Sequence, residues 1–259
     1  MCESGTPDDA LCLVGDCTSA TCDPSLYLLS GCGNYFPTDC KLSQDYVSYY
    51  KFETETAGST PDEAGANNGA LINNAVVVNN AERGSVLSLD GTGDYVNINN
   101  PGNVFDGKNI TISAWIYGNT WSNSYPRIID RGYDDQFAFY IAASESELSW
   151  AMDTLTGDID RANNNNVPIS TGQWYHVALV YNGISTITYI DGSIGNTYNW
   201  ATSGVLDNSN SDMRIGERAD AGTTRAFNGL IDDVMVYNRA LSSDEVNEIY
   251  CGQGGTVGC

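Results

Sequence analysis

The sequence has little positive charge. Its 259 residues contain 11 Lys and Arg against 33 Asp and Glu, which gives a formal net charge of −22. A surface with this balance repels phosphate backbones and anionic membrane surfaces, so nucleic acid is not an expected partner. The sequence also lacks an apolar run long enough to span a bilayer, and it lacks a glycine-rich phosphate-binding or dinucleotide-binding motif. These absences argue against nucleotide-binding and membrane-inserted classes.

Cysteine is missing from the whole middle of the chain. The eight cysteines cluster at its two ends, at Cys2, Cys12, Cys17, Cys22, Cys32, Cys40, Cys251 and Cys259. An even count favours disulfides and an oxidising, extracellular compartment. Zinc is the alternative, but the N-terminal spacing contains no C-x-x-C pair and the sequence holds a single histidine.

Three segments follow from this distribution. Residues 1–44 combine six cysteines with turn formers and little hydrophobic periodicity, so disulfides are expected to replace a core there. Residues 45–250 contain the β-rich domain described below. Residues 251–259 form a Gly-rich tail flanked by two cysteines. Because chain ends often lie close together in compact domains, we expect the tail to be cross-linked to the N-terminal segment, although spacing leaves the pairing open.

The middle of the chain is organised around residues 174–181, Trp-Tyr-His-Val-Ala-Leu-Val-Tyr. This run lacks proline, glycine and charge and is rich in β-branched and aromatic residues. Both alternating faces are apolar or aromatic, which predicts a strand between two layers. Asn182-Gly183 favours a type I′ turn into a return strand at 184–190, and Asp191-Gly192 turns the chain again. The pattern predicts a three-strand antiparallel meander.

Many further short strands and one helix are indicated. A long loop of turn residues is expected at 60–69. Ser242 and Glu245 form a capping box before a helix, with Leu241 placed as a hydrophobic staple. The other strands are expected at 46–52, 76–78, 85–89, 95–98, 110–117, 127–130, 136–142, 148–152, 213–216 and 230–237. This composition predicts an all-β fold, an antiparallel two-sheet β-sandwich of jelly-roll type with a small disulfide-rich N-terminal segment.

Seven sequence blocks carry a family resemblance, in order along the chain. They are residues 49–52, 62–69, 89–96, 111–116, 172–178, 189–192 and 227–242. With these blocks the chain resembles the laminin G-like, concanavalin A-like jelly rolls of extracellular modules from about residue 46 to residue 250; residues 1–44 fall outside. The resemblance implies two antiparallel sheets, a concave face and often one bound Ca²⁺. It also implies binding of glycans or proteins outside cells without catalysis.

The resemblance further implies which residues hold a structural calcium ion. In similar modules the loop that contains Asp62 approaches the acidic pair that contains Asp232, and Asp94 is a weaker third candidate. One carboxylate from each, with loop carbonyl groups, would form an oxygen cage. The alternative is that Asp62 stabilises its own turn and that Asp232 caps a strand end.

Aromatic residues in loops are the candidates for ligand binding. They are Trp121, Tyr125, Tyr198 and Trp200. An exposed ring stacks on the apolar face of a sugar while nearby amide and carboxylate groups bond its hydroxyls. In the alternative interpretation these rings fold back over the rim of the sandwich. Asn109 begins the only N-glycosylation sequon.

A catalytic role is not expected. Glu145 and Glu147 alternate as the carboxylates of a glycosidase strand do, but residues 143–147 also suit a hairpin tip. His176 lies mid-strand and is interpreted as a core histidine. We therefore expect a secreted or surface-displayed binding module for carbohydrate or an extracellular protein. There are two alternatives. The first is a self-assembling subunit of a surface layer or filament, which would form a homo-oligomer. The second is a targeting module of a larger glycan-degrading enzyme.

Overall fold

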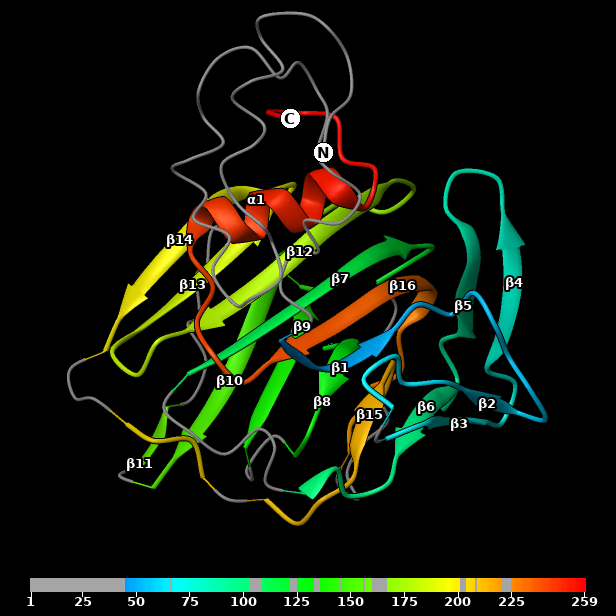
Figure 1. Ribbon diagram of the computed structural model, residues 1–259, viewed down its shortest axis with the longest axis horizontal. Helices are drawn as coiled ribbons and strands as arrows, with labels where there is room; N and C mark the ends of the chain where they lie inside the picture. The colour runs from blue at the N-terminus through cyan, green and yellow to red at the C-terminus, as the bar shows by residue number, and fades with distance from the viewer. Residues whose placement is uncertain are drawn as a thin grey trace, which may run out of the picture. The chain divides into compact units, whose positions relative to one another are not determined.

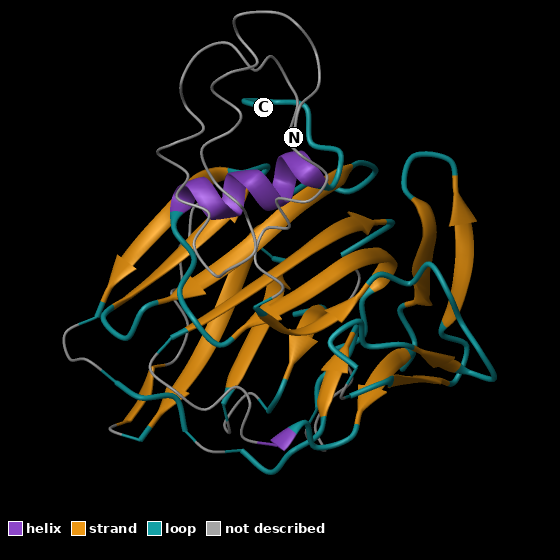
Figure 2. Cartoon of the chain, in the orientation of Figure 1, coloured by secondary structure: helices purple, strands orange, loops and turns teal. Residues whose placement is uncertain are grey.

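The computed structural model contains two antiparallel sheets that pack face to face (Figure 1, Figure 2). It describes residues 45–65, 67–102, 109–121, 125–132, 136–144, 146–155, 157–159, 167–200, 204–207, 209–219 and 225–259. The chain divides into the compact units Met1–Asp45 and Tyr46–Cys259. The six N-terminal cysteines lie outside the described residues. The described unit is the predicted all-β sandwich.

Sheet A contains the predicted meander at one edge. From edge to edge it runs through β14 (Ser193–Asn199), β13 (Ser185–Ile190), β12 (Trp174–Tyr181), β7 (Ile110–Gly118), β16 (Asn228–Tyr237), β5 (Gly84–Asp90) and β4 (Val76–Asn80). β1 (Tyr46–Tyr50) also pairs with β16. The central strand β12 therefore lies between β7 and β13, which confirms the interior position expected for residues 174–181.

Sheet B forms the second layer. Its order is β11 (Gly157–Ile159), β10 (Glu147–Thr154), β9 (Phe137–Ala142), β8 (Arg127–Asp130), β15 (Met213–Ile215), β6 (Tyr95–Ile98), β3 (Gly69–Ile72) and β2 (Ser59–Thr60). The short strands β2, β3 and β11 were not predicted. β2 and β3 border the expected loop, and all three are short, so they carry little periodic signal.

The main core lies between the sheets and follows the two-residue period of the strands. Phe137, Phe139 and Ile141 of β9 belong to it, whereas Ala138 and Tyr140 form a separate small cluster. Since successive side chains of a strand point to opposite faces, this second cluster marks the outer face of sheet B. That face becomes important below.

Both expected turns of the meander are present, but the first differs from the expectation in its geometry. Asp191 and Gly192 both have positive φ, 48° and 73°, as a type I′ turn requires. At Asn182-Gly183 only the glycine has positive φ. The side-chain oxygen of Asn182 instead accepts the N–H groups of Ile184 and Ser185 at 3.0 and 2.8 Å. A side-chain turn therefore replaces the predicted I′ geometry at the first position.

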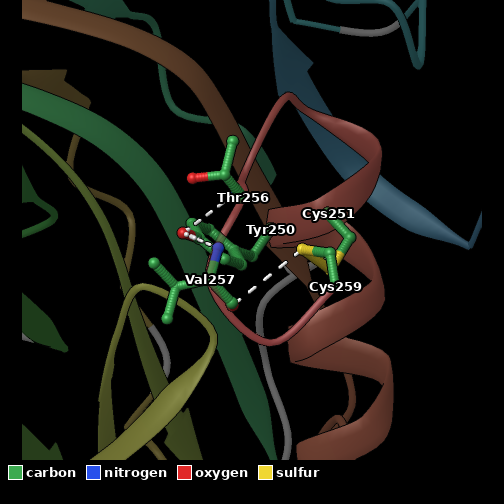
Figure 3. Close-up of a disulfide and its surroundings, with 5 residues drawn as sticks. All are labelled: Tyr250, Cys251, Thr256, Val257 and Cys259. Carbon is green, nitrogen blue, oxygen red and sulfur yellow. Dashed lines mark hydrogen bonds between the residues drawn. A yellow bond between two sulfur atoms is a disulfide. The ribbon is translucent and has the colours of Figure 1, made fainter.

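The helix α1 (Ser243–Gly252) begins at the predicted capping box. Ser242 and Glu245 exchange both hydrogen bonds, and α1 lies across the outer face of sheet A, over β12 and β13 (Figure 1). Cys251 and Cys259 are bonded to each other (Figure 3), so neither of them forms a disulfide with the N-terminal segment. The backbone N–H groups of Thr256 and Val257, which follow the helix, donate to the hydroxyl of Tyr250 within it. The expected cross-link between the two ends is therefore wrong, and the predicted boundary at residue 250 falls within α1.

A buried ion-pair cluster lies on the outer face of sheet A. Arg83, in the turn between β4 and β5, places Nε 2.7 Å from Asp232 and Nη2 2.6 Å from Asp233. Its guanidinium group lies 4.0 Å from the centre of the Trp115 ring. It also donates to the backbone carbonyl of Gln253 at 3.2 Å. One cation thereby joins a turn, two neighbouring strands and the end of the helix.

The ion pair lies where β16 changes its neighbour. Residues 228–231 pair with β5, and residues 234–237 pair with β1. Between them Asp233 has a φ of 48°, and the register with β7 shifts between Asp232 and Met235. This bulge interrupts the regular ladder and brings two carboxylates to one buried place. Arg83 supplies the positive charge that lets them stay there.

Removing this guanidinium group should destabilise the fold. In an Arg83→Met variant two buried carboxylates lose their shared cation, and such a loss costs about 3–5 kcal/mol. We expect the free energy of unfolding in urea to fall by that amount. Arg239→Gln is the control, because its ion pair with Glu245 has side chains 32% and 25% exposed and should contribute less than about 1 kcal/mol. Equal losses in the two variants would contradict the role assigned to Arg83.

The same cluster should make stability depend on pH. Burial, and then the charge of Asp233, raises the pKa of Asp232 from 3.8 to about 7 although Arg83 opposes the shift. Between those values the folded state binds more protons than the unfolded state, so stability falls as pH rises. From about pH 5 to about pH 8 we expect the protein to lose on the order of 1–3 kcal/mol more than an Asp232→Asn variant. Thermal and urea denaturation at each pH measure this difference, and parallel pH profiles would refute it.

Candidate functional site

Asp62, the first calcium candidate, is held by backbone donors. It is buried, and its Oδ1 accepts the N–H groups of Tyr49 at 2.8 Å and Ala64 at 3.0 Å. Its Oδ2 accepts the N–H group of Asn67 at 3.2 Å. The bond from Ala64, two residues further along, is the Asx turn that the sequence left open as an alternative. Asp62 thus stabilises its own loop and ties that loop to β1.

The other two calcium candidates are also engaged. Asp94 is buried and accepts the N–H groups of Asn74 and Asp90 at 2.9 and 3.2 Å, while Asp232 binds Arg83. Within the part of the chain that the structure describes, no group of three His, Cys, Asp or Glu side chains is placed to hold a metal ion. A cation would compete with N–H donors and a guanidinium group, so this arrangement does not fit an oxygen cage. Calcium stays a prediction from the resemblance.

Two of the four aromatic candidates pack inward. Trp200 is 8% exposed, stacks on Trp150 at 5.5 Å and donates from Nε1 to the hydroxyl of Thr186 at 2.8 Å. Trp121 packs edge-on against Phe227 with ring centres 5.7 Å apart. The alternative in which the rings fold back over the rim describes both residues. Packing inward buries the indole surface and, for Trp200, satisfies its N–H group.

Tyr198 and Tyr125 remain nearer the surface, on different sheets. Tyr198 is 42% exposed on β14, the edge strand of sheet A. Tyr125 is half-buried and packs at a right angle against Tyr140, with ring centres 5.8 Å apart. Because Tyr140 points away from the main core, Tyr125 lies on the outer face of sheet B. The structure therefore does not bring the four candidates into one site.

Two arginines accompany tyrosines on the outer face of sheet B. The Cζ atom of Arg225 lies 4.8 Å from the ring centre of Tyr125, and that of Arg214 lies 4.4 Å from Tyr95. Tyr95 and Arg214 point outward, because their strand neighbours belong to the core. We call Tyr95, Tyr125, Arg214 and Arg225 the tyrosine–arginine surface. All four residues are half-buried, so each still reaches solvent.

Glu217 fixes the loop that carries this surface. Its Oε1 accepts the N–H groups of Arg218 and Arg225, and the Arg218 carbonyl accepts a bond from Arg214 Nη1 at 2.8 Å. Burial raises the pKa of the Glu217 carboxyl, while these N–H groups and the charges of Arg214 and Arg127 oppose the shift. One carboxylate thus anchors both arms of the loop between β15 and β16.

Asp130, the last residue of β8, is a second structural acceptor. Its Oδ1 accepts the N–H groups of Gly132 at 2.8 Å and Ala219 at 3.0 Å, and its Oδ2 binds Arg127 Nε at 2.7 Å. Burial raises the pKa of the Asp130 carboxyl against the opposing charge of Arg127. The oxygens of Asp130 and Oε1 of Glu217 are therefore already in use as structural acceptors.

The arginines of this face were not predicted from the sequence. The signal was present, because five of the 11 basic residues fall in two short stretches, 127–131 and 214–225. The net charge of −22 gives no indication of this local group of basic residues. Only the pairing of β15 with β6 and β8 shows that the two stretches share one sheet face.

The residues considered for catalysis have structural positions. His176 is fully buried, its Nε2 lies 2.8 Å from the hydroxyl oxygen of Ser113, and burial lowers its pKa to about 3. It is a neutral core histidine, as predicted. Glu147 begins β10, whereas Glu145 lies outside the described residues. Asn109, the sequon residue, directly precedes β7 and is half-buried.

Solved structures share this fold at low identity. Domain 4 of AbnA, an extracellular GH43 arabinanase from Geobacillus stearothermophilus solved with arabinotriose, is 16% identical with a TM-score of 0.63; the match covers 80% of this chain and 98% of that chain. The binding domain of Paraclostridial Mosquitocidal Protein 1 is 16% identical with a TM-score of 0.61, over 81% of this chain and 52% of that one. The receptor-binding domain of botulinum neurotoxin D is 16% identical with a TM-score of 0.59, and the match covers 81% of this chain and 53% of that one.

These matches differ in extent. The arabinanase domain is matched over nearly its whole length, whereas this chain spans about half the length of the two toxin chains. At such identities the likeness concerns the fold alone. A comparison with curated protein sequences finds no match. The sequence profile of the family described as the concanavalin A-like lectin/glucanases superfamily matches residues 90–247, more than half of the chain, and the protein therefore belongs to that superfamily.

Proposed function

We propose that the protein is an extracellular, non-catalytic binding module whose principal ligand is carbohydrate, bound at the tyrosine–arginine surface. The observation that carries the proposal is the pairing of Tyr125 with Arg225 and of Tyr95 with Arg214 on one sheet face. Aromatic rings contact the C–H groups of a sugar, and guanidinium groups donate to its oxygens. A loop anchored by Glu217 presents these groups together.

The comparisons support a binding role. The arabinanase domain that matches over almost its full length was solved with arabinotriose, and the neurotoxin domain is described as receptor-binding. A glycan is therefore the first ligand to test and an extracellular protein the second. The Cys251–Cys259 disulfide suits an oxidising compartment. Among the described residues no helix has the length and apolar character needed to cross a membrane.

The carboxylates of this face favour binding over hydrolysis. A glycosidase requires one carboxyl group to deliver a proton and another to act as nucleophile or base. Here both oxygens of Asp130 and one oxygen of Glu217 accept structural hydrogen bonds. Groups held in this way position neighbouring residues, and they support a non-catalytic module.

A glycan-array assay followed by calorimetry tests the proposal. We expect saccharide binding to weaken roughly tenfold in a Tyr125→Ala variant, because an apolar contact to the sugar is lost. Tyr198→Ala is the matched control, since Tyr198 is exposed on the opposite sheet and its loss should leave affinity unchanged. Melting curves check that both variants fold. Binding that depends on Tyr198 and not on Tyr125 would place the site elsewhere.

The same assay, run in Ca²⁺ and again in a chelator, addresses the calcium prediction. A melting temperature and an affinity that fall on chelation and recover with added Ca²⁺ would support a structural calcium ion. Identical values in both conditions would agree with the hydrogen-bonded arrangement of Asp62 and Asp232.

Self-assembly is a second candidate function, favoured by the edge of sheet A. The seven residues of β14 carry no charged side chain, and Ile194 and Tyr198 are 55% and 42% exposed. A long uncharged edge strand is a surface on which another chain can add. In a protein of charge −22, such a strand is also where two copies repel each other least.

Light scattering across a concentration series distinguishes this candidate. Under self-assembly the measured mass rises with concentration, with or without reductant, and an Ile194→Lys variant returns it to the monomer value because charge on the edge blocks strand addition. A monomer at every concentration would eliminate the scaffold function and leave the binding module.

A further inference from the structure

We infer that the tyrosine–arginine surface selects acidic saccharides, those that carry a carboxylate group, over neutral ones. The inference rests on the proposed function and assigns a ligand class to the same surface. It starts from the distribution of charge. The chain carries 11 basic residues and a net charge of −22, and four of those residues lie on or act on this surface. They are Arg214 and Arg225, which belong to it, and Arg127 and Arg218, whose charges act on Arg225.

The nearby carboxylates do not neutralise the outermost arginines. Asp130 is committed to Arg127 and to two backbone N–H groups, and Glu217 anchors the loop. The ion pairs found within the described residues involve other arginines, and neither Arg214 nor Arg225 takes part in one. Among the residues that the structure describes, these two half-exposed cations therefore have no carboxylate in direct contact.

Arg225 lies near other positive charges that act on its guanidinium group. Its Nε is buried and has no acceptor among the described residues. Burial, and then the charges of Arg127 and Arg218, lowers the pKa of Arg225, although a guanidinium group stays charged at neutral pH. Bringing an anion to this position would relieve the repulsion among the three cations. The planar guanidinium group can bind both oxygens of a carboxylate at once.

The setting of the two cations favours a saccharide over an acidic peptide. Each guanidinium group lies beside a tyrosine ring, which supplies the apolar contact that a sugar ring requires. At physiological salt, charges act over about 8 Å. A small sugar with one carboxylate per ring therefore responds to the local arginines, whereas a long acidic chain extends over the negative remainder of the surface.

Calorimetry on the whole chain tests this inference with matched probes. Trigalacturonic acid and its methyl ester share one backbone and differ in charge. At low salt we expect the acid to bind at least about tenfold more tightly, with a ratio that shrinks as NaCl is added. Arg214→Gln and Arg225→Gln should each reduce that ratio severalfold, because they weaken binding of the acid more than binding of the ester. Arg239→Gln, whose guanidinium pairs with Glu245, is the control and should keep the ratio.

The outcomes separate the inference from the proposed function. Equal binding of acid and ester, or a ratio that survives both substitutions in folded variants, overturns the selection of acidic saccharides but leaves a carbohydrate-binding module. Absence of binding for both probes, and for neutral and acidic glycans on an array, overturns the function together with the inference. A preference for a tri-aspartate peptide over trigalacturonic acid would overturn the ligand class. The salt dependence needs no variant, so it remains decisive if a substitution impairs folding.

Discussion

A single guanidinium group connects parts of sheet A that backbone hydrogen bonds leave separate. Where β16 exchanges β5 for β1 as its neighbour, the ladder is interrupted and two aspartates become buried side by side. Arg83 binds both, and Tyr49 of β1 donates to Asp233 at 2.6 Å. Two buried carboxylates without a cation would be far costlier than the bulge itself. Arg83 thereby joins the turn between β4 and β5 to β16 at this bulge, and its bond to the Gln253 carbonyl joins both to the end of the helix.

The two sheet faces show opposite imbalances of charge. On the outer face of sheet A two carboxylates share Arg83, and the helix and its tail cover the arrangement. On the outer face of sheet B the half-exposed cations Arg214 and Arg225 take part in none of the ion pairs found among the described residues. The first imbalance is sealed inside the fold and contributes to stability. The second faces solvent, where it can act on a ligand, and this contrast is the reason for placing function on sheet B.

The sequence predicted the features that depend on interactions between residues close together in the chain. The strands at 95–98, 127–130 and 174–181 and the capping box at Ser242 agree with the structure because alternation and capping involve only neighbouring residues. It could not predict which loop aromatics turn inward. Trp200 packs on Trp150 of the other sheet, and that contact exists only once both sheets have formed. The calcium candidates show the same limit, since a carboxylate in a loop serves a metal or an N–H group with equal chemical ease.

The candidate site also shows why total charge is a poor guide to a ligand. A net charge of −22 excludes polyanions that must cover a wide surface, yet screening confines each charge to its surroundings within about 8 Å. The charges of Arg127, Arg218 and Glu217 shift the pKa of Arg225, so they also act on a ligand bound there. Sheet topology, which joins residues 127–131 to residues 214–225, creates this local field. An acidic protein can therefore present a cationic site, and its acidic remainder limits that site to small anions.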